Sequence, residues 1–201
     1  ESRFDFESGA ASRTVSMSTN LSFWNVLEKP SWVSVSPESG EAGEHTLTIN
    51  VEDNPNTTKR EGRVVVGNQG LSLADTLWVT QEGKSFGPLE TVLQFENVAS
   101  SNTLDISTDG DWTVTTSDGW ITVAPSSGHG NGQVTVTVEA NETDNERTGL
   151  LSVAVGGTVQ YVNVVQKGRY FTIDRGPSAS LPSKGGTIEL GIATNQAWTV
   201  A

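Results

Sequence analysis

The sequence of 201 residues contains no cysteine, so it can form neither a disulfide framework nor a thiolate metal site. Basic residues are scarce, because 12 Lys and Arg stand against 24 Asp and Glu, and the formal net charge is −12. Nucleic acids and anionic lipids bind clustered positive charge, so neither is expected as a partner. No apolar run approaches the ~20 residues of a membrane-spanning helix, so membrane insertion is not expected.

The motifs of common catalytic classes are also missing. There is no Gly-x-Ser-x-Gly elbow, no cysteine nucleophile and no phosphate-binding glycine loop. Paired carboxylates fall in turn-like stretches, so we expect no enzyme activity and no cofactor. The sequence begins at Glu1 without an initiator methionine or a signal peptide, and we interpret it as a mature piece or an excised fragment.

One phrase occurs twice in the sequence. The stretch PSWVSVSPESG (30–40) returns as DGWITVAPSSG (118–128), and a third copy begins where TIELGIATNQAWTV (187–200) matches TLDISTDGDWTV (103–114). The offset stays near 87 residues, and a fixed period of this kind indicates an array of similar domains. We therefore expect one repeat over 1–83, a second over 84–168 and a truncated third over 169–201.

Each repeat is predicted to be all-β, because valine, leucine and isoleucine alternate with polar residues, as in QVTVTV (133–138). Turn-forming stretches separate these runs, and no window shows helical spacing. The prediction is a tandem of immunoglobulin-like β-sandwiches. The strands expected in the second repeat are 92–95, 103–107, 111–115, 120–124, 133–138, 147–154 and 159–166.

The connections between repeats are short. The linker KSFGP (84–88) spans at most about 18 Å, so neighbouring domains should lie nearly end to end. The third copy has only the first strands of a sandwich, and we expect it to pack incompletely or against the second repeat.

Trp24 lies one residue further from its preceding Thr19 than Trp112 does from Thr108. Either Phe23 takes the tryptophan position or a residue is inserted as a bulge, which we favour.

Both full repeats resemble BACON domains (Bacteroidetes-associated, carbohydrate-binding, often N-terminal). The resemblance rests on TNQAWTV (194–200) and TDGDWTV (108–114), on the Trp–Pro–Ser–Gly phrase, on the stretches from Val51 to Gly62 and from Val138 to Gly149, and on the closing V-x-Q-x-G. It implies an immunoglobulin-like fold in an exported or cell-surface protein associated with glycan breakdown, next to further domains of the same polypeptide. It names no binding site.

Positions that recur between the copies are expected to serve the fold. We expect core or rim packing for the tryptophans, a structural ion pair or loop-anchoring hydrogen bond ahead of ligand binding for the arginines, and hydrogen bonds to buried backbone groups for the glutamines. The recurring residues are Trp24, Trp112 and Trp198; Trp32 and Trp120; Arg60 and Arg147; Gln81 and Gln166.

Trp78 does not recur, since its counterpart is Asn163. Alternation directs Trp78 and Thr80 outward, and places Tyr161 on the same face of the second repeat. An outward tryptophan among threonines can stack on a sugar ring, so Trp78 and Tyr161 are the candidate carbohydrate contacts. The alternative is an edge aromatic that packs under the loop 67–74 or against a neighbouring domain.

The acidic stretches, among them DGD (109–111) and ETDNE (142–146), lack the spacing of a calcium loop and are predicted to be solvated turns. His45 and His129 have no further ligands at metal-binding spacing, so no metal site is expected. Three functions stay open: carbohydrate association, a structural spacer that holds a neighbouring domain away from the cell envelope, and adhesion to a protein partner. A concave surface with two or more exposed aromatics would favour carbohydrate, and a flat polar surface would favour the spacer.

Overall fold

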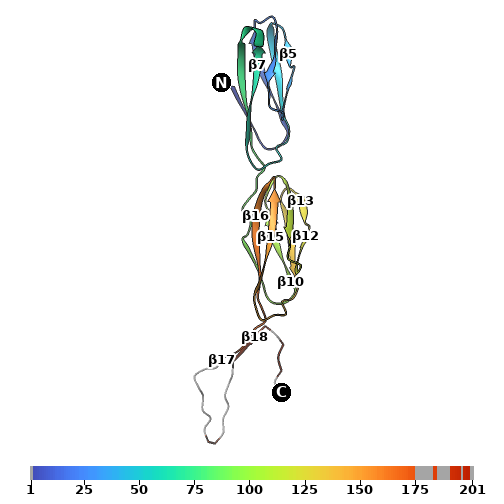
Figure 1. Cartoon of the computed structure of the whole chain (residues 1–201), viewed down its shortest axis with the longest axis vertical. Coiled ribbons are helices and arrows are strands. Elements are labelled where there is room, and N and C mark those ends of the chain that lie inside the picture. The colour runs from blue at the N-terminus through green and yellow to red at the C-terminus, as the bar shows by residue number, and fades with distance from the viewer. Residues whose placement is uncertain (1, 175–182, 185–190, 196, 200–201) are drawn as a thin grey trace.

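The computed structural model describes residues 2–174, 183–184, 191–195 and 197–199. Two sandwiches follow each other along the long axis of the molecule (Figure 1). The first is formed by the blue to green part of the chain and the second mainly by the yellow to orange part. We call them domain 1 and domain 2. The fold class is all-β and immunoglobulin-like, as predicted, and none of the described residues forms a helix long and apolar enough to cross a membrane.

Domain 1 consists of a five-stranded sheet in the order β1-β8-β7-β3-β5 and a three-stranded sheet in the order β2-β6-β4. The first strand pairs in parallel with the last, whereas the other pairs are antiparallel. A short 3-10 helix, η1 (Gln69–Leu71), lies in the β7–β8 hairpin. The strands are β1 (Ser2–Phe6), β2 (Ala11–Thr19), β3 (Trp24–Glu28), β4 (Val33–Ser36), β5 (Ser39–Gly40), β6 (Gly43–Val51), β7 (Arg60–Asn68) and β8 (Leu73–Gln81).

Domain 2 repeats this arrangement with sheets β13-β11-β15-β16-β9 and β10-β14-β12. Its first strand again pairs in parallel with its last. All seven strands predicted for this repeat are present, and the short strand β13 is an addition. The strands are β9 (Val92–Phe95), β10 (Ser100–Ile106), β11 (Asp111–Thr116), β12 (Ile121–Ala124), β13 (Ser127–His129), β14 (Gly132–Val138), β15 (Arg147–Val155) and β16 (Thr158–Gln166).

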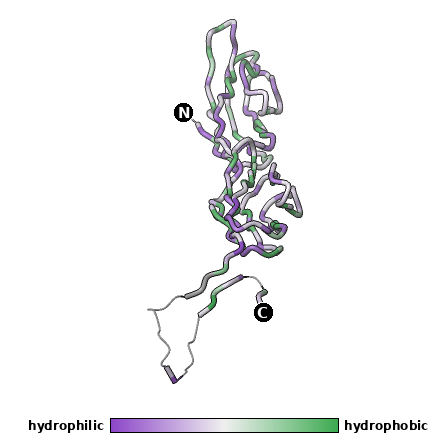
Figure 2. The backbone as a smooth tube through the Cα atoms, turned by 60° about the horizontal axis from the view of Figure 1, so that its bottom comes forward, coloured by the Kyte–Doolittle hydropathy of each residue, from purple (hydrophilic) through white to green (hydrophobic). Residues whose placement is uncertain are grey.

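The period-two pattern produces the core of each domain. In β14, Val134 and Val136 are completely buried, while Thr135 between them and Thr137 after them face solvent. Hydrophobic positions therefore recur along the strands of both domains, without a single long apolar run (Figure 2). Burying this apolar surface is the main term that stabilises each sandwich.

The recurring tryptophans mark the same place in both cores. Trp24 is 0% exposed and Trp112 is 3% exposed, whereas Phe23 is 50% exposed, so Trp24 takes the shared position. The extra residue lies before Trp24, as favoured, but it is in the loop 20–23 and outside the paired strand, so it forms no β-bulge. The Trp112 indole donates a hydrogen bond to the carbonyl of Gly130 at 2.9 Å.

The repeated sequence motif that ends in Ser-Gly (30–40 and 118–128) has a packing reason, because its glycine lies against the tryptophan of each domain. Gly40 pairs with Trp24, and Gly128 pairs with Trp112. A Cβ atom at Gly128 would lie 2.6 Å from Cε2 of Trp112 and closer still to Cζ2, so the strand can approach the ring only with glycine at this position. The prolines of the phrase, Pro37 and Pro125, both follow cis peptide bonds.

Of the third repeat, β17 (Phe171–Asp174) pairs in antiparallel fashion with β18 (Gly191–Thr194). Residues 187–190, at the start of the third copy, and its end at 200–201 lie outside the described residues. Trp198 is 49% exposed, so it is not buried in a core, and of the expected core or rim packing only the rim alternative remains for it. The strands that cover Trp112, β13 and β15, have no counterpart among the described residues that follow Trp198.

Candidate functional site

A buried polar cluster lies at the base of each domain, and the recurring arginine and glutamine form it. In domain 1, Arg60 donates to Oε1 of Gln81 at 2.9 Å and 2.7 Å and to the carbonyl of Glu52 at 2.7 Å. Gln81 is 0% exposed and donates through Nε2 to the carbonyls of Ser8, Gly9 and Glu52. Burial lowers the pKa of Arg60, and neighbouring carboxylates partly oppose that shift.

Domain 2 repeats the cluster almost atom for atom. Arg147 donates to Oε1 of Gln166 at 2.9 Å, and Gln166 donates to the carbonyls of Glu96, Val98 and Glu139. The guanidinium carbon of Arg147 lies 4.2 Å from the ring centroid of Trp120, as that of Arg60 lies 4.4 Å from Trp32. The hydrogen bonds found for these arginine and glutamine side chains all go to groups of the same domain.

The junction between the domains is held by Asp109, in the loop between β10 and β11. Its carboxylate accepts hydrogen bonds from the backbone N–H of Ser85 at 2.5 Å, from the Ser85 hydroxyl at 2.7 Å, and from the hydroxyl of Ser8 in domain 1. Burial raises the pKa of Asp109, but these hydrogen bonds outweigh it and lower the pKa to about 2. Asp109 lies in an exposed bend, as predicted for a solvated turn, but its carboxylate is engaged by the linker and by domain 1.

Backbone contacts extend the junction to both sides of Asp109. Thr108 donates through Oγ1 to the carbonyl of Ser85 at 2.6 Å, and Phe86 forms a β-bridge with Thr108. Across the interface, the N–H of Thr57 donates to the carbonyl of Gly156 at 3.3 Å, and the Thr57 and Thr158 hydroxyls are hydrogen bonded. The linker is thus fixed between two domains that also touch directly.

The end of domain 2 carries the same linker pattern. Arg169 and Tyr170 follow β16 as Lys84 and Ser85 follow β8. The N–H of Tyr170 donates to Oδ1 of Asn195 at 2.8 Å, and Thr194 donates through Oγ1 to the carbonyl of Tyr170 at 2.8 Å. Thr194–Asn195 therefore holds Tyr170 as Thr108–Asp109 holds Ser85.

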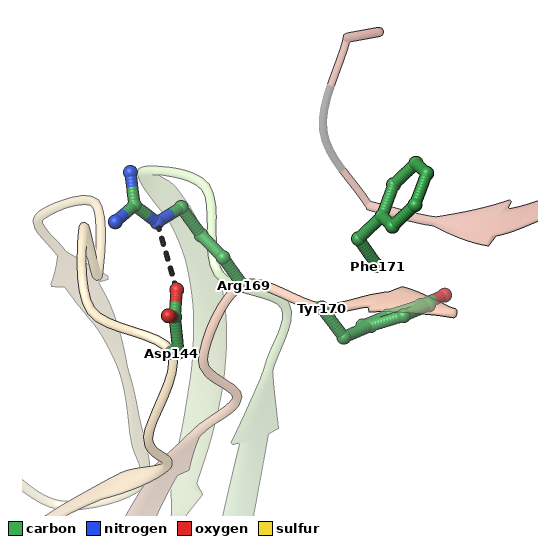
Figure 3. A pocket seen from close by; sticks show the side chains of 4 residues that line it. All are labelled: Asp144, Arg169, Tyr170 and Phe171. Atoms are coloured by element: carbon green, nitrogen blue, oxygen red, sulfur yellow. Dashed lines mark ion pairs between the residues drawn. The ribbon is translucent and has the colours of Figure 1, made fainter. Parts of the chain in front are cut away.

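A shallow pocket of about 600 Å³ adjoins this second linker and is lined by Asp144, Arg169, Tyr170 and Phe171. Arg169 reaches toward Asp144, with Nε 3.5 Å from Oδ1, while the two aromatic side chains lie further along the chain (Figure 3). The pocket lies beside the linker. Its residues Arg169, Tyr170 and Phe171 correspond to Lys84, Ser85 and Phe86 at the first junction.

Trp78 lies on the outer face of the five-stranded sheet of domain 1, where it is half-buried. It stands in register with Arg3 on β1 and Arg63 on β7, so β8 is an inner strand and Trp78 is no edge aromatic. Both arginines are ion-paired: Arg3 with Glu61 at 2.5 Å and Arg63 with Glu28 at 2.8 Å. The hydrogen bond from Arg63 lowers the pKa of Glu28.

Thr80 differs from the expectation of an outward-facing residue, because it is only 1% exposed. Arg3 donates to its hydroxyl at 2.6 Å. The surface around Trp78 therefore carries paired charges, and the hydroxyl of Thr80 is bonded to Arg3.

Domain 2 presents a more apolar outer face. Tyr161 is 58% exposed, and Leu150 and Val92 flank Asn163 in register on the neighbouring strands. Trp78 and Tyr161 thus lie on equivalent faces of different domains.

The histidines form local contacts. His129 lies 2.7 Å from a carboxylate oxygen of Asp111, and Nε2 of His45 lies 2.8 Å from the carbonyl of Glu41. Within the described ranges, no group of three or more His, Asp or Glu side chains could hold a metal ion.

The fold and the junction define a class of protein: tandem immunoglobulin-like sandwiches joined end to end by a short, hydrogen-bonded linker. Two family models match the chain, "Putative binding domain, N-terminal" of the BACON family over residues 22–82 and "Viral BACON domain" over residues 88–169. The chain belongs to the BACON family and contains two BACON-type domains in tandem. Neither model describes a catalytic domain.

The chain is also similar to part of an enzyme. It is 32% identical over 78 residues to the xyloglucan-specific endo-beta-1,4-glucanase BoGH5A of Bacteroides ovatus, covering 39% of this chain and 16% of that protein. A solved Bacteroides ovatus GH5 xyloglucanase in complex with a XXXG heptasaccharide is 30% identical, with a TM-score of 0.40 over 43% of this chain and 19% of the enzyme. The I9–I11 tandem of titin gives a TM-score of 0.43 at 10% identity, over 86% of this chain and 65% of the titin chain.

Proposed function

We propose that the two BACON-type domains form a non-catalytic spacer in an exported, carbohydrate-associated protein, and that they hold a neighbouring domain at a set distance. The observation that carries the proposal is Asp109, which accepts hydrogen bonds from the linker residue Ser85 and from Ser8 of domain 1. A flexible linker would leave the two domains to reorient, whereas a linker bonded on both sides restricts bending.

Replacing Asp109 by alanine should loosen the junction. Because the chain has no cysteine, spin labels can be attached to Ser12→Cys on β2 and Thr135→Cys on β14, both at exposed positions. Pulsed EPR should give one narrow distance distribution for the parent protein and a distribution at least about twice as wide for Asp109→Ala, since three hydrogen bonds are lost. Asp111→Ala, which affects only the His129 contact, is the control.

The junction should also depend on pH in a defined direction. The pKa of Asp109 falls from 3.8 to about 2, so the contacts are complete above about pH 4 and weaken as the pH falls toward 2. Asp109→Asn should keep the narrow distribution and lose this pH dependence, because Asn195 fills the same role at the second linker. A broad distribution for the parent protein at neutral pH would refute the spacer proposal. Equally narrow distributions for the parent protein and Asp109→Ala would show that the Thr57 contacts hold the junction without Asp109.

A second candidate function is direct contact with carbohydrate through Tyr161, supported by its 58% exposure and its position two residues before Asn163, which Leu150 and Val92 flank. Aromatic rings bind the apolar C–H faces of sugars, and Asn163 supplies an amide nearby. Calorimetric titration with xyloglucan and with mucin glycans should show saturable binding that Tyr161→Ala reduces at least about tenfold if this is correct. Trp78→Ala tests the domain 1 face in the same way, and absence of binding by the parent protein would exclude both residues.

A further inference from the structure

The upper end of domain 1 contains the same two-residue motif that holds the linkers below it. Thr19–Asn20 matches Thr108–Asp109 and Thr194–Asn195, because β2 pairs with β6 as β10 pairs with β14. In the two later copies the threonine hydroxyl donates to a linker carbonyl, and the aspartate or asparagine accepts the N–H of the same linker residue. We call this motif the linker clamp.

In domain 1 the linker clamp holds no linker. The hydroxyl of Thr19 accepts only the N–H of Leu21, at 3.2 Å, and the side chain of Asn20 is exposed and has no hydrogen-bond partner among the described residues. Thr108 is 5% exposed beneath its linker, whereas Thr19 is half-buried. The chemistry that binds a peptide backbone is therefore present and unused at this end.

The surface around this clamp has the shape and polarity that a linker requires. A cleft of about 610 Å³ contains Thr19 and Asn20 on its rim, with Met17, Trp24 and Val66 among its apolar lining. In domain 2, Phe86 packs against the core and Leu89 is 8% exposed within it, and Ile106, the counterpart of Met17, is 2% exposed. Met17 is only half-buried, since no linker residue covers it among those described.

Large apolar side chains surround the same end of domain 1. Phe23, Leu71 and Leu73 are 50%, 56% and 54% exposed. Asn68 connects them, because its amide donates to the carbonyl of Phe23 at 2.9 Å and its Oδ1 accepts the N–H of Leu71. In domain 2 the corresponding hairpin at Gly156 contacts Pro55 and Thr57 of the preceding domain. The exposed apolar groups thus occupy the position at which one BACON-type domain meets another.

We propose that the linker clamp of domain 1 receives an extended peptide segment that leads into β1, as Ser85–Leu89 leads into β9. A segment that fits offers one backbone N–H and one C=O to Thr19–Asn20. It also carries two apolar side chains with the same spacing as Phe86 and Leu89. The other two clamps of this chain hold the linker residues Ser85 and Tyr170, and for this reason we choose an extended peptide as the occupant. Domain 1 would hold this segment by the geometry found at the other two linkers.

The test extends the full chain with Lys-Ser-Phe-Gly-Pro-Leu fused directly before Glu1, which places the new leucine three residues ahead of Arg3, as Leu89 precedes Val92. Amide hydrogen exchange of the added serine, measured by NMR, should be at least about tenfold slower in the extended parent protein than in the extended Asn20→Ala variant. This is the effect expected from one hydrogen bond to the backbone N–H. The side-chain amide resonances of Asn20 should also shift.

Ser85 provides an internal reference, because its N–H is held by Asp109 in every variant. Protection of Val79, which is completely buried, shows that domain 1 is folded. Equal exchange of the added serine with and without Asn20 would overturn the proposal. The EPR distance between domains 1 and 2 tests the spacer role separately, so either proposal can fail alone.

Discussion

Gln166→Ala should destabilise domain 2 by about 3–4 kcal/mol, the largest effect we expect of any single substitution here. The side chain is 0% exposed and donates to the carbonyls of Glu96, Val98 and Glu139. Its removal takes from the carbonyl of Glu96 its only donor among the described residues, whereas the carbonyls of Glu139 and Val98 keep Arg147 and Ser100 as donors. A buried polar group left unpaired costs about 1–3 kcal/mol. Arg147 would lose its contact with Oε1 as well. Urea unfolding followed by hydrogen exchange, which resolves the two domains, measures the change.

Gln133→Ala is the matched control, because Gln133 is an exposed glutamine of the same domain that reaches only Asp105, at 2.8 Å. Its substitution should change stability by less than about 0.5 kcal/mol. Domain 1 should unfold at the same denaturant concentration in both variants. A loss below about 1 kcal/mol for Gln166→Ala would mean that water or a rearranged loop satisfies those carbonyls without the amide.

Gly128→Ala should cost domain 2 about 1–3 kcal/mol through overpacking. The added methyl would overlap the ring of Trp112, which is 3% exposed and bonded to the carbonyl of Gly130, so neither the strand nor the ring can move freely. A change in the tryptophan fluorescence maximum should accompany the loss, because the ring would have to shift.

Gly119→Ala separates this packing effect from the general effect of replacing glycine. A Cβ at Gly119 meets no atom within 4 Å, so the substitution should leave stability unchanged or raise it by a few tenths of a kcal/mol. Thermal unfolding of both variants under the same conditions makes the comparison. Equal melting temperatures would show that the close approach of Gly128 to Trp112 carries no stability.

The fold could be predicted because its signals are local. Alternation in QVTVTV fixes which side chains of β14 face inward, and the 87-residue period supplies a second copy of every strand. Whether Trp24 or Phe23 takes the shared tryptophan position could be decided only from the structure. An extra residue in a loop does not alter the pattern of hydrophobic residues in the strands. Thr80 shows the limit of alternation, which gives the face of a residue but cannot show that Arg3, 77 positions away, covers it.

The junction was missed for a related reason. Asp109 follows a strand and precedes a glycine, so locally it has the composition of a solvated turn. Its partner Ser8 lies 101 positions earlier, and no periodicity relates the two. One signal was present: threonine followed by asparagine or aspartate stands before the tryptophan in all three copies, at Thr19, Thr108 and Thr194. A polar pair kept at three equivalent ends is a sign of a shared contact.

The parallel pairing of first and last strands determines how each domain bears mechanical load. In both domains the chain enters along one strand and leaves along its parallel neighbour, β1 beside β8 and β9 beside β16. Tension on the two ends of a domain therefore pulls these neighbours in opposite directions along their length. The hydrogen bonds between them are loaded together in shear and cannot open one at a time. A protein that is drawn between a surface and its target would resist extension at every domain of such an array.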